Sequence, residues 1–190
     1  MLYDSDTVNE VNMAGQLYSY DDIDSSKVNS LERMIRRYTT LGEIYTIMDN
    51  YTDTCPAGDI MICGFDNMEA RKTFFESWKS HVDATPKENR KNCLLLDGRL
   101  DMSNLQVFCL TGDDAYNINR YKDEFLFSDA EADQTVCSMK QTTYMACMIG
   151  SIITNLLVNF TANLTDPVLP YDLPFLTEYD AQNIIFKTTN

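Results

Sequence analysis

An α/β fold, with a mainly parallel sheet flanked by helices and extended by antiparallel strands, is the architecture that the sequence predicts. The first observation is the continuous apolar run over residues 60–65, which has the length and composition of a strand buried on both faces. The second is the amphipathic helical pattern that follows directly, with apolar side chains at Phe75, Trp78 and Val82. The third is the order of elements, because strands alternate with helices early in the chain and become consecutive later.

The part of the chain before this run predicts a strand, a helix and a second strand. Residues 1–8 have the pattern of a strand end that runs into two aspartates. Apolar side chains at helical spacing predict a helix over residues 28–38. Residues 43–48 alternate as a strand does, and a loop at residues 55–58 leads into the run at 60–65.

The part after this run predicts one helix, two strands, a long loop and a final helix. The first helix covers residues 67–82, and buried strands follow at residues 93–97 and 105–110. Residues 112–136 are acidic and aromatic, which predicts a crossover loop that folds over a site. Residues 139–160 have the pattern of a helix with a wide apolar face.

The apolar helix at residues 139–160 is long enough to be weighed as a membrane span. Asparagines and threonines interrupt it, for example at Asn155 and Asn159, and flanking lysines are few. These features favour a buried core helix, so no membrane association is expected.

Length and composition limit the function classes. At 190 residues with 44% apolar content, the chain is expected to form one domain over residues 1–165, followed by an extended tail over residues 166–190. The net charge of −14 argues against binding nucleic acid by general phosphate neutralisation. Six cysteines form no C-x-x-C pair and His81 is the only histidine, which argues against zinc. The first residues lack the pattern of a secretory signal, so a cytoplasmic location is expected.

Asp66 and Asn67 lie where the apolar run at residues 60–65 ends and the next helix begins. In an open α/β sheet, ligands bind beyond the carboxyl ends of the strands, so a carboxylate at this junction could hold a metal or a nucleotide. The alternative is that one of the two side chains only caps the helix. Spacing by itself favours the cap.

Two stretches together resemble the ThiF-type adenylyltransferases, the superfamily that includes the ubiquitin-activating enzymes. The first stretch is DSDTVNEVNMAGQ over residues 4–16, which is similar to the family segment D-x-D-x-V-x-x-x-N-x-x-R-Q. The second is DNMEAR over residues 66–71, which is similar to the family motif D-N-x-x-x-R. Lys27 falls near the position of a family lysine, and the resemblance covers about residues 1–165. It implies a Rossmann-like ThiF fold.

Members of this family use ATP and magnesium to adenylate the C-terminal carboxylate of a ubiquitin-like or sulfur-carrier protein. The resemblance therefore implies an ATP site, a magnesium ion and a carrier-protein partner, together with a homodimer or heterodimer. By the same resemblance, Asp66 holds magnesium or orients the nucleotide, and Asp66, Lys27 and Arg71 act in catalysis. The remaining implied nucleotide contacts are Asp4 on the ribose, Asn12 and Gln16 around the phosphates, and Asn67 beside Asp66.

Two departures from the family pattern bear on activity. The glycine-rich loop G-x-G-x-x-G belongs upstream of Met1, so the first βα unit is missing from residues 1–190. That loop matters because its backbone N–H groups hold phosphates. Gly15 stands where the family has an arginine. Either another segment supplies the missing unit, or the chain is a non-catalytic scaffold or partner-binding subunit.

Cys137 is the candidate for the thioester cysteine that some family members use, because it follows the expected crossover loop and precedes a helix. A buried structural cysteine is the favoured alternative. A nicotinamide-dependent oxidoreductase is a third function class, and it rests only on the acidic Asp4 at a strand end.

Overall fold

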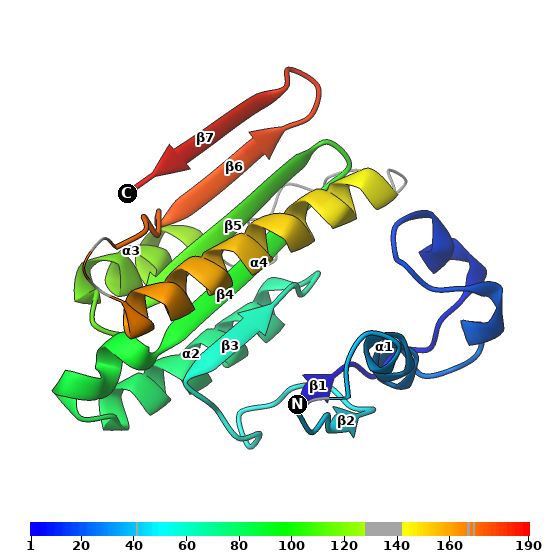
Figure 1. The fold of residues 1–190 in the computed structure, drawn as a ribbon, viewed down its shortest axis with the longest axis horizontal. Helices are drawn as coiled ribbons and strands as arrows, with labels where there is room; N and C mark the ends of the chain where they lie inside the picture. The colour runs from blue at the N-terminus through cyan, green and yellow to red at the C-terminus, as the bar shows by residue number, and fades with distance from the viewer. Residues whose placement is uncertain (41, 128–141, 167, 169) are drawn as a thin grey trace.

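The computed structural model describes residues 1–40, 42–127, 142–166, 168 and 170–190 (Figure 1). Five strands form the main sheet in the order β3-β4-β5-β6-β7, and β1 and β2 form a separate pair. The strands are β1 (Leu2–Tyr3), β2 (Thr46–Ile47), β3 (Ile60–Cys63), β4 (Leu94–Leu100), β5 (Asn104–Thr111), β6 (Leu176–Asp180) and β7 (Ile185–Thr189). The α-helices are α1 (Lys27–Arg36), α2 (Met68–Ala84), α3 (Ala115–Phe125) and α4 (Thr143–Thr165), and short 3₁₀ helices cover Glu10–Ala14, Tyr20–Asp22 and Lys87–Asn92.

The predicted α/β class is confirmed, with parallel strands first and antiparallel strands added after them. β1 pairs with β2 and β3 pairs with β4 in parallel, whereas β4–β5, β5–β6 and β6–β7 are antiparallel. Among the described residues antiparallel pairs thus outnumber parallel ones, which is a larger antiparallel share than the sequence predicted. The reason is that β5, β6 and β7 lie side by side in the sheet, each antiparallel to the strand before it, although α3 and α4 separate β5 from β6 along the chain.

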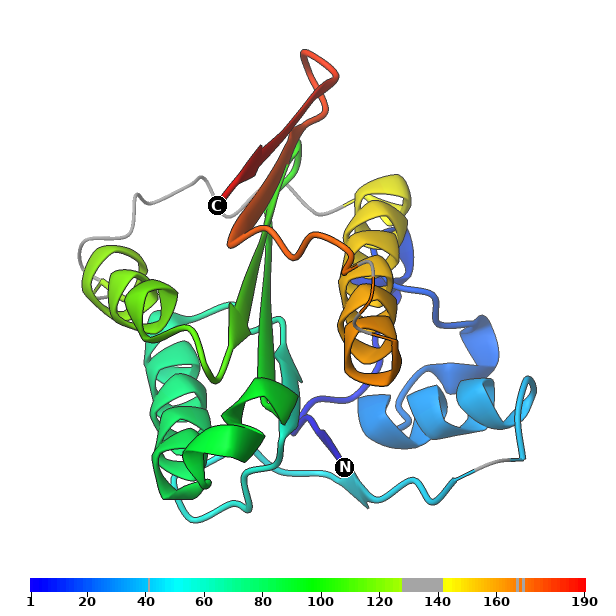
Figure 2. The same cartoon turned by 60° about the vertical axis from the view of Figure 1, so that its left-hand side comes forward.

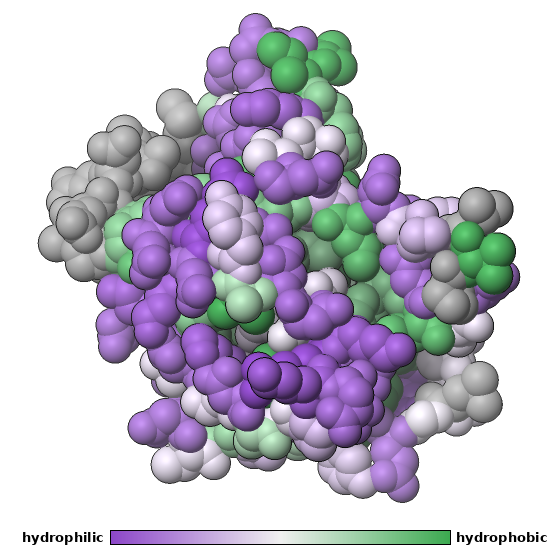
Figure 3. Space-filling view, turned by 90° about the vertical axis from the view of Figure 1, so that its left-hand side faces the viewer, coloured by the Kyte–Doolittle hydropathy of each residue, from purple (hydrophilic) through white to green (hydrophobic). Residues whose placement is uncertain are grey.

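Helices cover both faces of the main sheet, with α2 and α3 on one face and α4 on the other (Figure 2). Successive strand residues point to opposite faces, so Leu95 packs under Trp78 on the α2 side while Leu94 and Leu96 pack under α4. This is why residues 93–96 form a continuous apolar run. The end of the molecule where β3 and β4 begin faces the viewer in Figure 3, and its surface is mainly hydrophilic with separate hydrophobic patches.

The predicted crossover loop at residues 112–136 is wrong in its first half, because Ala115–Phe125 form α3. Asp114 caps this helix by accepting a hydrogen bond from the backbone N–H of Asn117 at 3.0 Å. Ile118 and Tyr121 are buried one turn apart against the sheet. Residues 128–136 lie outside the described part of the chain.

Residues 166–190, expected as an extended tail, contribute two strands to the main sheet. β6 pairs with β5 from Asn104↔Asp180 to Phe108↔Leu176, and β7 pairs with β6. Phe175 is buried directly before β6 and packs on Phe108 with ring centroids 5.7 Å apart. The tail is therefore integrated with the sheet of the domain that precedes it, while the division at residue 165 stays a prediction.

Helix α4 covers one face of the sheet and is not the fully buried core helix that its apolarity predicted. Met145, Leu156 and Phe160 are buried against β4 and β5, and the opposite face of the helix is exposed. The helix approaches closely at Gly98, where a Cβ would come within 3.1 Å of Ile149. Among the described residues it alone has the length and apolarity of a membrane span, with 17% of its apolar window buried, which is weak evidence for one.

β3 is the edge strand of the main sheet. Its Ile60 and Ile62 share a face with Leu94 and Leu96 of β4, because the register pairs Ile60 with Leu94 and Ile62 with Leu96. The two leucines are buried under α4, whereas each isoleucine is 43% exposed. Helix α4 thus covers β4 and β5 and leaves β3 uncovered on this face.

Candidate functional site

A cavity of about 1040 Å³ opens beyond the end of β3, where the chain passes through Gly64 and Phe65 to Asp66. Ligands of open α/β sheets bind in this position. Its walls include residues 15–18, residues 98–101 at the end of β4, residues 104–106 of β5, the inner side of α4, and the β6–β7 hairpin. Leu31 and Met34 of α1 add apolar surface to one side. The cavity therefore has a polar end near Asp66 and an apolar side between α1 and α4.

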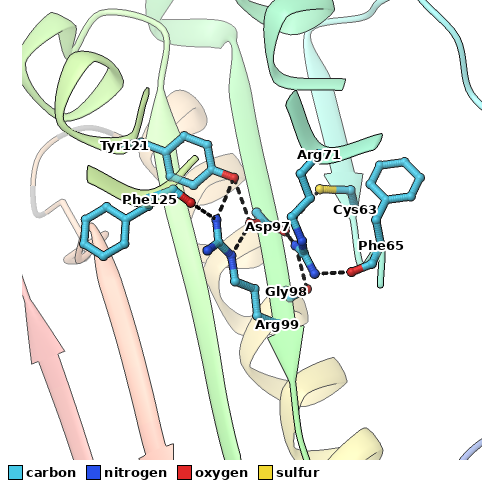
Figure 4. Close-up of polar contacts among 8 residues, drawn as sticks. All are labelled: Cys63, Phe65, Arg71, Asp97, Gly98, Arg99, Tyr121 and Phe125. Atoms are coloured by element: carbon cyan, nitrogen blue, oxygen red, sulfur yellow. Dashed lines mark hydrogen bonds and ion pairs between the residues drawn. The ribbon is translucent and has the colours of Figure 1, made fainter. Parts of the chain in front are cut away.

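Asp97 is the centre of a buried polar cluster beneath this cavity (Figure 4). Its carboxylate is inaccessible to solvent and pairs with the guanidinium groups of Arg71 and Arg99. The Arg99 Nε donates at 2.8 Å, the Tyr121 hydroxyl donates at 2.8 Å, and the Cys63 thiol donates at 3.3 Å. Two cations and two neutral donors thus surround one carboxylate, which satisfies a charge that would otherwise be costly to bury.

The two arginines are fixed by further contacts. Arg71 donates to the backbone carbonyl of Phe65, directly before the Asp66 junction. Arg99 donates to the carbonyl of Phe125 at 3.0 Å and lies over the ring of Phe108, 4.5 Å from its centroid. The cluster therefore ties the end of β3, the end of β4 and the last turn of α3 together.

The pKa values of Tyr121, Cys63 and Arg99 are all raised in this cluster. Burial and the Asp97 charge raise the pKa of Tyr121, and the same two causes raise the pKa of Cys63 well above its ordinary value. Burial opposes the charge on Arg99, but the neighbouring Asp97 carboxylate raises its pKa overall. Tyr121 and Cys63 are therefore neutral donors at neutral pH, and neither is an activated nucleophile.

Three of the predicted site residues line the cavity, namely Asp66, Gln16 and Arg71. Asp66 is exposed, and its Oδ1 accepts a hydrogen bond from the Asn67 amide at 3.2 Å. Asn67 is the N-cap of α2, because its side-chain oxygen accepts from the backbone N–H of Ala70 at 2.8 Å. Of the two candidate caps, Asn67 takes the capping position, so the exposed Asp66 carboxylate is not used as the cap.

The other predicted contacts lie outside the cavity lining. Lys27 forms an ion pair with Asp6 at 2.7 Å. Asp4 accepts a hydrogen bond from the backbone N–H of Asp6, and Asn12 accepts one from the backbone N–H of Asn9. The roles assigned to Asp4, Asn12 and Lys27 stay predictions, as does that of Cys137, which lies outside the described residues.

Of the two neighbouring residues Gly15 and Gln16, only Gln16 provides a polar side-chain group to the cavity. Gly15 is buried in its wall and offers no side chain where the resemblance implies a cation. The side-chain oxygen of Gln16 is buried and has no hydrogen-bond partner among the described residues. Because an unpaired buried acceptor is costly, this oxygen is suited to a donor on a bound molecule.

The cations of the cavity lining are already paired with carboxylates. Arg71 and Arg99 pair with Asp97, and Lys187 lies 3.8 Å from Glu178. The described lining therefore holds no unpaired cation for a phosphate. Asp66 by contrast fits magnesium, which is commonly held by one or two carboxylates together with water and substrate phosphates.

Sequence reasoning found the Asp66 junction and missed the Asp97 cluster. The available signal was a charged pair, Asp97 and Arg99, that directly follows a continuous apolar strand pattern. Charged residues are rarely buried without partners. What the sequence did not provide was the identity of the partner, Arg71, which lies 26 residues away.

No family model matches the chain, and no curated protein matches its sequence. Solved structures match its fold over nearly the whole chain. PaaA matches with a TM-score of 0.68 at 15% identity, covering 97% of this chain and 54% of PaaA. E. coli MccB with ATP matches with a TM-score of 0.65 at 14% identity, and MccB with MccA-N7isoASN matches with 0.63 at 13%; each covers 99% of this chain and 55% of MccB. The chain thus shares the ThiF-type Rossmann-like fold of these neighbours and spans about half of their length.

Proposed function

Because the chain has the fold of MccB, which has been solved with ATP, we propose that it takes part in the ATP-dependent adenylation of a C-terminal carboxylate. The acceptor carboxylate belongs to a peptide or to a small ubiquitin-like or sulfur-carrier protein. The observation that carries the proposal is Asp66, an exposed carboxylate on a cavity at the carboxyl end of β3. This is where an open α/β sheet binds its ligand.

In this proposal, Asp66, Gln16 and the Asp97 cluster have separate roles. Asp66 holds magnesium, and that ion supplies neutralisation of charge on the phosphate oxygens when bound. Gln16 offers its side-chain oxygen, which has no hydrogen-bond partner within the described part of the chain, to a donor of the nucleotide or the acceptor. The Asp97 cluster holds the Phe65 backbone through Arg71, so it positions the Asp66 junction, and Arg71 and Arg99 also lie in the cavity lining.

Phosphate-binding cations are the part that the described cavity does not supply. In this proposal a further segment, with the glycine-rich loop that the resemblance implies, brings the N–H groups that hold the phosphates. The apolar side of the cavity, which includes Leu31, Met34 and Ile149, is suited to packing against such a segment.

A second candidate is a non-catalytic, partner-binding subunit. The paired state of Arg71, Arg99 and Lys187, together with Gly15 in the cavity wall, favours it. In this case the chain would dimerise with a catalytic partner and leave nucleotide binding to that partner.

Calorimetry and pyrophosphate exchange separate the two candidates. The protein is isolated as it occurs, with any segment preceding Met1 and any co-purifying partner, and titrated with ATP in the presence of magnesium. ATP–pyrophosphate exchange is then measured with Asp66→Asn, using Asp53→Asn as the matched control because Asp53 is also exposed and lies outside the cavity lining. Loss of exchange in Asp66→Asn but not in Asp53→Asn supports the adenylation site. Exchange that is unchanged in Asp66→Asn overturns the role of Asp66, and an absence of both binding and exchange supports the non-catalytic subunit.

A further inference from the structure

Asp59, His81 and Cys93 come together at the end of the sheet opposite to the cavity. Asp59 directly precedes β3 and Cys93 directly precedes β4, and these parallel strands begin at the same end. His81 lies in the last turn of α2, which returns to this end. The 17 residues of α2 span about 25 Å at 1.5 Å each. The cluster is therefore independent of the chemistry at Asp66.

The three side chains present one donor atom each, and these atoms all lie within 4.8 Å of one another. His81 Nε2 is 2.8 Å from Asp59 Oδ1, and Cys93 Sγ is 3.9 Å from the same oxygen. Cys93 is buried, whereas the side chains of His81 and Asp59 are 32% and 63% exposed. The thiol is thus the buried donor of the cluster, and the imidazole and the carboxylate are the donors that solvent reaches.

Backbone contacts fix the positions of all three residues. The Asp59 carbonyl accepts from the Leu94 N–H at 2.8 Å and from the Trp78 indole at 3.4 Å. The Cys93 N–H donates to the Arg90 carbonyl at 2.9 Å, and the His81 carbonyl accepts from the Thr85 hydroxyl at 2.8 Å. Such anchoring limits the reorganisation that a bound ion would require.

The donor set selects among metals. A thiolate and an imidazole favour zinc over magnesium or calcium, which prefer oxygen ligands. Ligands around tetrahedral zinc lie about 3.5 Å apart, given zinc–ligand distances of about 2.0–2.3 Å. The separation of Cys93 and Asp59 suits this geometry, and the half-exposed His81 side chain needs to move from Asp59 by less than about 1 Å.

We propose that Asp59, His81 and Cys93 form a zinc site whose fourth ligand is water. The ion joins the start of β3, the end of α2 and the start of β4, so its principal effect is to stabilise this end of the sheet. Two anionic ligands balance the divalent ion, and the guanidinium of Arg90 is the neighbouring charge that opposes it. The expectation of no zinc rested on the lack of C-x-x-C and on the single histidine, whereas this site uses that one histidine, with ligands 22 and 12 residues apart along the chain.

Cobalt titration of the metal-free protein tests the proposal. Co²⁺ bound to a thiolate gives near-ultraviolet charge-transfer absorption together with visible bands, and zinc displaces it. We expect both signals in the native chain and a rise in melting temperature with added zinc. Cys93→Ser removes the charge-transfer band, and His81→Gln weakens cobalt and zinc binding by about tenfold or more. Cys147→Ser is the matched control, because this thiol is exposed on α4 away from the cluster.

The native protein lacking the charge-transfer band would overturn the proposal, and so would a band that persists in Cys93→Ser. His81→Gln keeps the test decisive if Cys93→Ser fails to fold, since His81 is partly exposed at a helix end. Zinc binding and melting temperature are read without nucleotide. Failure here therefore leaves the adenylation proposal untouched, and failure of pyrophosphate exchange leaves the zinc site untouched.

Discussion

Replacing Asp97 with asparagine removes the single negative charge that two buried arginines share. The substitution keeps the shape of the side chain, so packing is preserved and the change is electrostatic. Arg71 and Arg99, with side chains only 8% and 13% exposed, then face each other across a neutral amide. Arg71 keeps the backbone carbonyls of Phe65 and Gly98 as partners, and Arg99 keeps that of Phe125.

Breaking a buried ion pair by removing one partner typically costs about 3–5 kcal/mol, because the other charge is left uncompensated. Two charges are left here, so we expect a loss of unfolding free energy at the upper end of that range. For a chain of this size about 1 kcal/mol lowers the melting temperature by roughly 2–4 °C, so a loss of about 5 kcal/mol gives a fall of roughly 10–20 °C. Arg71→Met should cost less, since Asp97 keeps Arg99 and Tyr121.

Urea denaturation of the native chain, Asp97→Asn, Arg71→Met and the double variant measures these losses. Asp53→Asn, an exposed carboxylate, is the control and should change the unfolding free energy by less than about 0.5 kcal/mol. The double variant should cost less than the sum of the single ones, because both remove the same interaction. A loss below about 1 kcal/mol in Asp97→Asn, or full additivity, would refute the view of Asp97 as the shared partner of both arginines.

Three further outcomes are expected. Asn67→Ala should lower the unfolding free energy by about 1 kcal/mol in urea denaturation, whereas Asn67→Asp keeps the capping oxygen and should be near neutral. Hydrogen bonds from the Ser19 backbone and side chain, and from Arg33, lower the pKa of Asp22 well below its ordinary 3.8, so its contribution to stability is present above that pH and lost as the pH falls. Stability curves from pH 7 to 2 should therefore be flatter in Asp22→Asn, and parallel curves would contradict this account. Burial raises the pKa of Cys109 to about 12, so iodoacetamide at pH 8 followed by mass spectrometry should label exposed Cys147 well before Cys109.

The fold was predictable from sequence where burial leaves a periodic pattern. The run at residues 93–96 is apolar at every position because helices cover both faces of β4, and this identifies a central strand. Helix α3 was not predicted, because the acidic and aromatic residues on its exposed side obscure the helical spacing of Ile118 and Tyr121. The pairing of β6 with β5 was not predicted, because it joins residues about 70 apart in the chain and leaves no local sequence pattern.

The candidate site was predictable only at its local features. The apolar run that ends directly before Asp66 and Asn67 is a local signal, and the capping role of Asn67 follows from helix chemistry. The tertiary structure decides which carboxylate forms an ion pair with each lysine or arginine. Lys27 pairs with Asp6 and Arg71 pairs with Asp97, and no sequence spacing distinguishes these lysine and arginine residues from free ones.

The uncovered edge of β3 has a consequence for handling the protein. Among the described residues no strand pairs with this edge, and Ile60 and Ile62 expose apolar surface beside it. An open apolar strand edge is a template for another copy of the same edge, which is a common route to aggregation. Residues 1–190 produced in isolation should therefore associate increasingly with concentration. Ile62→Lys should suppress that association, because a charge on an edge strand opposes the pairing of copies.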